Sequence, residues 1–187
     1  MITFITTPRY FKGIFKNIQT NAISSWLNII GDKEILLFDV EKPLDEIKKH
    51  NNVIIINDIK VNSFGTPLIS DLLCKGQHLG KGPIFCFINC DIILPHNFLQ
   101  TAIICQNKFN KFLMIGHRND LEFNNEVDFS DSNQENKFWE YAKKNAKKHG
   151  SWGIDYFVFT SGVWETIPDF AIGRFMYDNW LIWQARR

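Results

Sequence analysis

The sequence carries almost no excess charge. Its 187 residues include 21 lysines and arginines against 20 aspartates and glutamates, a formal net charge of +1. Proteins that bind nucleic acid need basic surfaces that neutralise phosphates, and the chain has no basic block of the kind that follows a phosphate backbone. We therefore expect no nucleic-acid partner.

Long apolar runs are also missing. Stretches such as VIIIN and IFCFIN fall far short of the roughly 20 residues that cross a bilayer. The opening MITFITTPRYF lacks the charged region and cleavage site of a signal peptide. These absences predict a soluble cytoplasmic protein with no transmembrane segment.

The four cysteines form no CxxC pair. Cys86 and Cys90 are four residues apart, so on one strand they would be separated by about 13 Å, too far for a disulfide. Buried free thiols are favoured over a disulfide or a zinc site, which suits a reducing compartment.

What the sequence does contain is an alternation of short apolar runs and longer segments with helical period. This alternation predicts an α/β fold with a mostly parallel central sheet flanked by helices, in one domain over 1–187. Runs that are apolar on both faces are typical of strands covered by helices on both sides. The predicted strands are 2–6, 34–38, 53–56, 84–89, 112–116 and 156–160, and the predicted helices are 13–30, 43–50, 67–73, 95–105, 137–150 and one from about Asp178.

The stretch 117–136 differs from the rest because it is polar and aperiodic. It predicts a long surface excursion before the basic helix 137–150, which Gly150 would end.

Polar residues follow the ends of the first four predicted strands. In open α/β sheets, ligands lie beyond these carboxyl ends. Any one of the residues could simply form a turn, whereas the set together favours a nucleotide site. The set comprises Thr6-Thr7-Pro8-Arg9, Asp39, Asn57-Asp58 and Asn89-Cys90-Asp91.

Glycine is too sparse after the first strand to wrap a pyrophosphate. Gly13 stands alone there, with no Gly-x-Gly-x-x-Gly and no P-loop in the chain. A bound phosphate would therefore need another counter-charge, such as a divalent cation held by a strand-end carboxylate, and Asp91 is placed to hold one.

The motif FINCDIIL resembles the Asp-x-Asp strand of nucleotide-sugar-dependent glycosyltransferases of the GT-A fold, with Asn89 first and Asp91 last. Further similar stretches span nearly the whole chain: FITTPRYF, QTNAISSWL, SFGTPLISDLL, MIGHRNDL and IDYFVF followed by IPDFAIGRFMYDNWLIWQAR. The resemblance implies a GT-A-like sheet with a nucleotide-sugar-binding half, 1–116, and a mixed acceptor and catalytic half, 117–187.

By position, the resemblance implies nucleobase contacts from the first strand end and from Asp39. An aspartate that accepts the uracil N3–H would favour UDP over a purine nucleotide. Arg9 either reaches the diphosphate or is an exposed loop cation. Gly65 and Thr66 either lie beside the ribose and sugar or start a helix with Thr66 as its N-cap. The implied donor contacts are Thr6, Thr7, Pro8, Arg9, Asp39, Gly65, Thr66, Asn89, Cys90 and Asp91.

The closing segment resembles that of inverting enzymes, in which Asp178 would be the catalytic base. One-step displacement needs a carboxylate opposite the leaving group to take the acceptor's proton. The alternative role of Asp178 is a helix N-cap. Asp155, and Asp120 as a rival, suit gripping sugar hydroxyls. Three aromatic residues either form a platform for a sugar ring or belong to the core: Trp164, Phe170 and Trp180.

The resemblance thus implies an enzyme that moves a sugar from a UDP-sugar to a hydroxyl of a glycan or glycoprotein, by inversion. Mn²⁺ or Mg²⁺ would bridge the diphosphate to Asp91, with weaker help from Asn89. The chain stops at Arg187, before the histidine that completes the metal shell in many such enzymes. Either Asp91 and the diphosphate hold the metal, or this is one domain of a longer polypeptide.

Two other functions stay open on the residues alone. One is a non-catalytic domain that binds a nucleotide-sugar or a glycan. The other is a sugar nucleotidyltransferase, which is disfavoured because TTPRYFKG lacks the glycine-rich loop of those enzymes.

Overall fold

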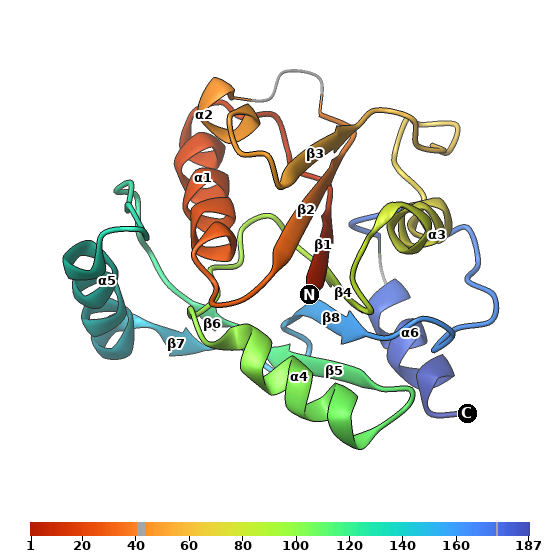
Figure 1. Ribbon diagram of the computed structural model, residues 1–187. Helices are drawn as coiled ribbons and strands as arrows, with labels where there is room; N and C mark the ends of the chain where they lie inside the picture. The colour runs from red at the N-terminus through yellow and green to blue at the C-terminus, as the bar shows by residue number, and fades with distance from the viewer. Residues whose placement is uncertain (41–43, 175) are drawn as a thin grey trace.

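The structure is a computed structural model that describes residues 1–40, 44–174 and 176–187. Its elements alternate as predicted for an α/β protein (Figure 1). In chain order they are β1 (Ile2–Thr6), α1 (Ile14–Leu27), β2 (Lys33–Phe38), α2 (Asp45–Lys48), β3 (Val53–Ile56), α3 (Ile69–Leu79), β4 (Ile84–Ile88), α4 (Phe98–Lys108), β5 (Leu113–His117), β6 (Asn119–Asp120), α5 (Ser132–Asn145), β7 (Lys147–Lys148), β8 (Ile154–Phe159) and α6 (Tyr177–Ala185).

The central sheet has six strands in the order β3-β2-β1-β4-β8-β5. The pairs among β3, β2, β1 and β4 are parallel, and β8 runs antiparallel to both of its neighbours. The predicted α/β class with a mostly parallel sheet is therefore confirmed. Because β8 lies between β4 and β5, the two predicted halves of the chain share one sheet.

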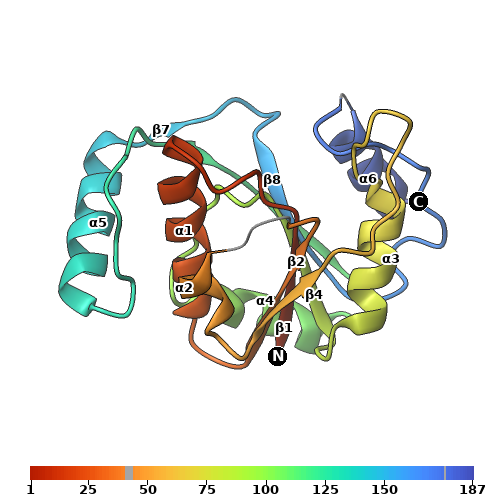
Figure 2. The same ribbon diagram turned by 90° about the horizontal axis from the view of Figure 1, so that it is seen from above.

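Helices cover both faces of this sheet, as strands apolar on both faces require (Figure 2). The core on one face joins the sheet to α1, α2 and α4. There Trp26 of α1 stacks on Phe4 of β1 with ring centroids 5.4 Å apart, and both are fully buried. Burial of a large apolar side chain of this kind stabilises the fold by about 1.5–3 kcal/mol.

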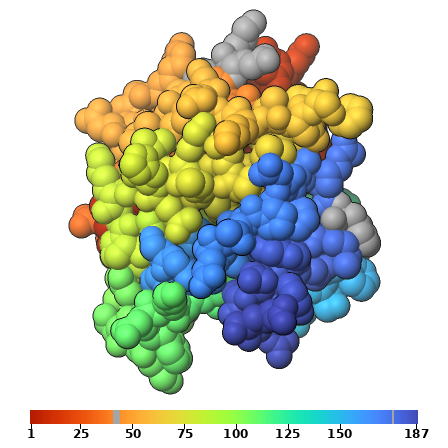
Figure 3. All heavy atoms as spheres, turned by 90° about the vertical axis from the view of Figure 1, so that its right-hand side faces the viewer, coloured from red at the N-terminus to blue at the C-terminus, as the bar shows by residue number. Residues whose placement is uncertain are grey.

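The opposite face is covered by α3 and α6. Figure 3 shows the C-terminal segment packed alongside the α3 region. An isolated bridge joins Leu68 to Ala171, and the Ser70 hydroxyl donates to the Asp169 carboxylate at 2.5 Å. Trp164 belongs to this core and donates its Nε1–H to the Leu181 carbonyl at 2.8 Å. Of the alternatives for Trp164, the core is therefore correct and the sugar platform is wrong.

Helix starts at proline were predicted too early. Helix α3 begins at Ile69, because Pro67 pairs with Val61 in an isolated bridge, and it continues to Leu79 rather than ending at 73. Helix α4 begins at Phe98, after a turn in which the Phe98 N–H donates to the Pro95 carbonyl. The start predicted at Pro43 lies outside the described residues.

The predicted surface excursion 117–136 and basic helix 137–150 are partly wrong. Helix α5 begins at Ser132 because Asp131 caps it, accepting from the N–H of Asn133 at 2.8 Å. It ends at Asn145, before β7, which pairs with β6 in a short two-stranded ribbon, and not at Gly150. Phe129 is buried against Phe138, so the stretch also carries a core residue.

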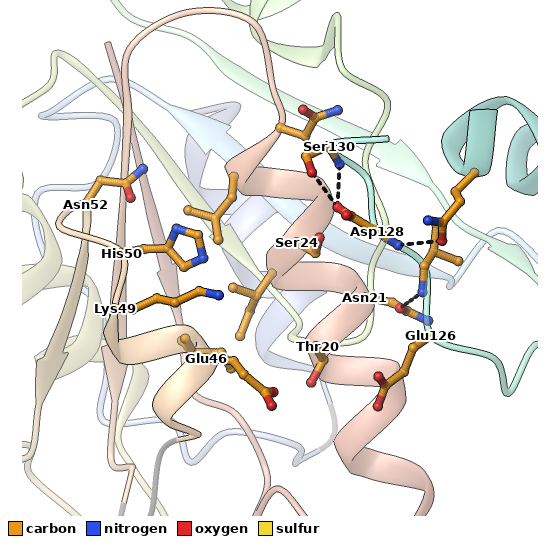
Figure 4. A pocket seen from close by; sticks show the side chains of 16 residues that line it. Thr20, Asn21, Ser24, Glu46, Lys49, His50, Asn52, Glu126, Asp128 and Ser130 are labelled. Atoms are coloured by element: carbon orange, nitrogen blue, oxygen red, sulfur yellow. Dashed lines mark hydrogen bonds between the residues drawn. The ribbon is translucent and has the colours of Figure 1, made fainter. Parts of the chain in front are cut away.

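Two asparagines of α1 fasten the 124–127 loop to that helix. Asn21 donates to the Asn125 carbonyl at 2.8 Å and accepts from the Val127 N–H at 2.9 Å, while Asn17 donates to the Asn124 carbonyl at 3.0 Å. An open cavity of about 650 Å³ lies between α1, α2 and the segment that follows this loop (Figure 4). None of the predicted site residues lines it.

In the part of the chain that the structure describes, every helix is too short or too polar to traverse a lipid bilayer.

Candidate active site

The order in which the strands are added to the sheet changes direction between the parallel neighbours β1 and β4. The chain runs from β1 to β2 and β3 on one side, whereas β4 pairs with β1 on the other. A crevice beyond the carboxyl ends of the strands at such a switch point is where open α/β sheets bind ligands. The parallel register pairs Ile5 with Phe87, so the residues after β1 and β4 emerge side by side.

Three residues at the ends of these strands have buried side chains. The Thr6 hydroxyl is buried without a hydrogen-bond partner in the described part of the chain, and Pro8 is also buried. Cys90 points into the core, and desolvation, followed by the charge of Asp91, raises the pKa of its thiol. A thiol in this state is a poor nucleophile and a poor metal ligand.

The loop after β1 is held by Gln19 of α1. This buried amide accepts from the Arg9 N–H at 2.6 Å and donates to the Arg9 carbonyl at 2.9 Å. The Arg9 side chain is exposed and its guanidinium lies 4.9 Å from the ring centre of Phe15. Its charge reaches the site, because it lowers the pKa of Asp91. The backbone of the predicted phosphate-binding loop is thus fixed while its cation stays free to contact a ligand.

Asp91 follows β4 with its side chain accessible to solvent. Its pKa is nevertheless raised, first by desolvation from surrounding atoms and then by the charge of Asp155, with Arg118 and Arg9 acting in the opposite direction. A carboxylate that is crowded by protein yet open to solvent is well suited to receive a cation.

Asp155 of β8 is bound from two sides. The Asn89 side-chain amide donates to its Oδ1 at 2.7 Å, and the Arg118 guanidinium donates to both of its oxygens at 3.0 and 3.2 Å. The Asp155 side chain is only 10% exposed. Its charge is therefore compensated within the protein, and most of the hydrogen-bonding capacity of its oxygens is already used.

The network continues outward through Arg118 into the β6–β7 ribbon. The Arg118 Nε–H donates to Asp120 at 2.9 Å, and His149 Nδ1 lies 2.6 Å from the other Asp120 oxygen. The pKa of Asp120 is lowered, first by the hydrogen bond with His149 and then by Arg118. The role of Arg118 was missed in the sequence, where His-Arg-Asn-Asp was assigned to a surface loop. The nearby Asp120, two residues further on, was the local signal for one of its two partners.

Asp178 lies at the second residue of α6, and Met176 occupies the N-cap position with φ 79°. The N-cap alternative for Asp178 is therefore wrong. Its Oδ1 accepts only from the neighbouring Asn179 N–H, at 2.8 Å, among the bonds of the described residues. Tyr177 links the helix start to the site: desolvation and the charges of Asp178 and Asp155 raise its pKa to about 12. Both carboxylates thus lie close enough to Tyr177 to act on its titration.

The remaining predicted donor contacts are placed by their backbone. Asp39, after β2, is exposed and adopts a left-handed conformation with φ 57°. Gly65 has φ 75° in a turn that Asn62 closes by accepting from the Thr66 N–H at 3.0 Å. Leu68, not Thr66, occupies the N-cap position of α3, so the capping alternative for Thr66 is wrong. No hydrogen bond in the described residues joins these three to the Asp155 network.

Comparison with known proteins gives only partial matches. The chain matches no protein-family model and no curated protein sequence. Solved structures that resemble it include residues 1–349 of S. aureus TarS in complex with UDP, at 15% identity and a TM-score of 0.46. The complex with UDP-GlcNAc gives 15% and 0.45, and the protein without a ligand 14% and 0.44.

Each of these alignments covers 60% of the present chain and 33–34% of TarS. The chain therefore spans about a third of the length of these TarS structures. Similarity at this level transfers no residue role.

The acidic residues provide some, but not all, of the ligands that a cation needs. Across residues 1–40, 44–174 and 176–187, no three His, Cys, Asp or Glu side chains are grouped closely enough to form a metal site by themselves. Asp91 offers open carboxylate oxygens beside the charge of Asp155, whereas the Asn89 amide nitrogen is used on Asp155 and leaves only its oxygen. A cation here would need further ligands, which a diphosphate supplies.

Proposed function

We propose that the chain binds a UDP-sugar at the β1–β4 switch point and transfers the sugar to a hydroxyl of a glycan or glycoprotein. The observation that supports this best is that the charges of Asp155, Arg118 and Arg9 all act on the pKa of Asp91, the accessible carboxylate that follows β4. An accessible carboxylate within reach of the charge of an exposed arginine suits a diphosphate with a divalent metal ion.

The donor residues then have distinct roles. Asp91, with the Asn89 oxygen, would hold Mn²⁺ or Mg²⁺, which when bound offsets charge on the departing diphosphate. Arg9 contacts a phosphate oxygen from the loop that Gln19 holds. Thr7 and Asp39 would contact the nucleobase, with Asp39 accepting the uracil N3–H, whereas the buried Thr6 side chain could act only through its backbone.

The two catalytic candidates differ in how their oxygens are used. Asp155 is occupied by Asn89 and Arg118, so it suits holding a sugar hydroxyl rather than taking a proton. Asp178 accepts one backbone N–H and is otherwise available in the described structure. We assign it as the base: the acceptor oxygen bonds to the anomeric carbon, the bond to the diphosphate breaks, and the acceptor's proton moves to Asp178.

Calorimetric titration with UDP, GDP and their sugars, with and without Mn²⁺, tests the donor site. We expect UDP to bind more tightly with Mn²⁺, and Asp91→Ala to remove that gain. Asp45→Asn, on exposed α2, is the control that should leave binding unchanged. Equal UDP affinity with and without Mn²⁺ in the wild-type protein would remove the metal from the proposal.

Hydrolysis of UDP-sugars in the presence of Mn²⁺ tests catalysis, because transferases slowly hydrolyse their donor without an acceptor. We expect Asp178→Asn to abolish transfer and to retain UDP binding. Normal turnover in this variant would remove Asp178 from the mechanism. Complete inertness of the wild-type protein across the donor panel, with UDP still bound, would indicate a non-catalytic binding domain.

A further inference from the structure

Trp152 is a large aromatic residue on the surface, with 73% of its side chain exposed. It lies in the turn between β7 and β8. An exposed indole beside a polar cluster offers a ligand both an apolar face and hydrogen-bonding groups.

The indole of Trp152 packs against a neighbouring side chain. Its ring meets the edge of the His149 imidazole, with centroids 6.1 Å apart and an interplanar angle of 88°. A Cβ at Gly150 would lie 2.8 Å from Cζ2 of Trp152, and a Cβ at Gly153 would lie 2.5 Å from Cδ2 of His149. A side chain at either position would displace the neighbouring ring from its present place.

This turn joins Trp152 to the candidate active site. The Arg118 N–H donates to the Gly153 carbonyl at 3.0 Å, while His149 lies 2.6 Å from Asp120 and Arg118 binds Asp155. Trp152 precedes Asp155 by three residues, so their Cα atoms are at most about 11 Å apart. Trp152 therefore lies at the rim of the site, on the side of the 117–187 segment.

The groups around the indole indicate its ligand. Asp120 is half exposed and accepts hydrogen bonds, so it disfavours a phosphate and favours hydroxyl groups. A flat aromatic face next to hydroxyl-binding groups suits a neutral pyranose ring, which has an apolar C–H face and a polar rim.

We propose that Trp152 is the platform on which an acceptor pyranose stacks, with the half-exposed Asp120 carboxylate accepting a hydrogen bond from one of its hydroxyls. This inference rests on the proposed function, because it assigns the acceptor side of the same site. It names the acceptor class as a neutral glycan with a pyranose ring whose C–H face is open for stacking.

Nuclear magnetic resonance of the full chain labelled with ¹⁵N-tryptophan provides the test. The Trp152 indole N–H signal is assigned as the one that Trp152→Phe removes. Titration with chitobiose and with cellobiose should shift this signal saturably. We expect Trp152→Ala to weaken binding of the responsive sugar about two- to twelvefold, which corresponds to the roughly 0.5–1.5 kcal/mol of an aromatic contact, and Trp152→Phe to weaken it less.

Trp183→Ala is the matched control, since Trp183 is also exposed, at 51%, but lies further along α6 under Arg187. It should leave sugar binding unchanged. No shift of the Trp152 signal with either sugar, or equal weakening by Trp183→Ala, would overturn the proposal. UDP binding is measured separately on the wild-type protein: UDP bound without sugar rejects the platform alone, whereas sugar bound without UDP rejects the donor site alone.

Discussion

Asn89 and Asp155 are joined twice: the Asn89 backbone N–H donates to the Asp155 carbonyl at 3.0 Å, and its side-chain amide donates to the carboxylate at 2.7 Å. Asn89→Asp would replace the second donor by a like charge. We expect the free energy of unfolding to fall by about 1–3 kcal/mol without divalent cations. Added Mn²⁺ should recover part of this loss, because two carboxylates would then face the ion. Urea denaturation with EDTA and with Mn²⁺ measures both effects.

The matched control is Asn145→Asp, since Asn145 is exposed and its amide donates only to the Tyr141 carbonyl. It should change stability little, with or without Mn²⁺. If Asn89→Asp also leaves the free energy of unfolding unchanged, the hydrogen bond to Asp155 does not contribute to stability.

Among substitutions of partly exposed cationic side chains in this protein, Arg118→Met should be one of the more destabilising. It leaves the Asp155 carboxylate, only 10% exposed, with the Asn89 amide as its remaining side-chain partner in the described structure. The expected loss is about 2 kcal/mol in the free energy of unfolding. Lys16→Met, which breaks the exposed Lys16–Glu126 pair, should cost roughly 0–1 kcal/mol. Similar losses in the two variants, by chemical denaturation, would contradict this.

Gln19→Leu should loosen the loop after β1 while leaving the helix intact. It removes both hydrogen bonds to the Arg9 backbone, at a cost of about 1–2 kcal/mol. UDP affinity should fall with it, because Arg9 would lose its fixed position. Gln77→Leu, whose side chain donates only to Leu73 within α3, is the control for both measurements. Unchanged UDP affinity in Gln19→Leu would separate the loop from the donor site.

Asp71 should make stability depend on acid pH. Desolvation raises its pKa, but the Lys60 N–H and the Lys75 ammonium, 2.8 and 3.0 Å away, outweigh this and lower the pKa below 3.8. A carboxylate with a lowered folded-state pKa contributes stability above its unfolded pKa and loses it as pH falls through the folded value. Asp71→Asn should therefore lower the melting temperature at pH 7, and its difference from wild type should shrink below about pH 5.

The control for this pH dependence is Asp45→Asn, which breaks a comparable pair with Lys48 in which the carboxylate is 97% exposed. It should shift the melting temperature little at either pH. A constant difference between Asp71→Asn and wild type across the range would exclude the linkage.

The strands were predictable because their signal is local: apolar on both faces and bounded by turn residues. The Val53–Ile56 strand matches its predicted bounds. The start of α5 was hidden because Asp131, its cap, stands in a polar run that resembles a loop.

The centre of the site could be predicted only in part. Asp91 was identifiable as a carboxylate that follows a predicted strand, and Asp155 as one that precedes a predicted strand. Their proximity follows from the insertion of β8 between β4 and β5, a pairing between segments some 70 residues apart. Single-sequence periodicity contains no information on such a pairing, so the ion pair of Arg118 with Asp155 could not be anticipated.

Side-chain amides of helix α1 form hydrogen bonds with two loops that are far apart in the sequence. Gln19 holds the Arg9 backbone, while Asn17 and Asn21 hold the 124–127 loop of the other half of the chain. The loop that carries Arg9 and the loop leading to α5 are thus both hydrogen-bonded to one helix. A shift of this helix along or about its axis would displace both loops together, so a mutation on its core-facing side, such as at the buried Trp26, should disturb both loops at once.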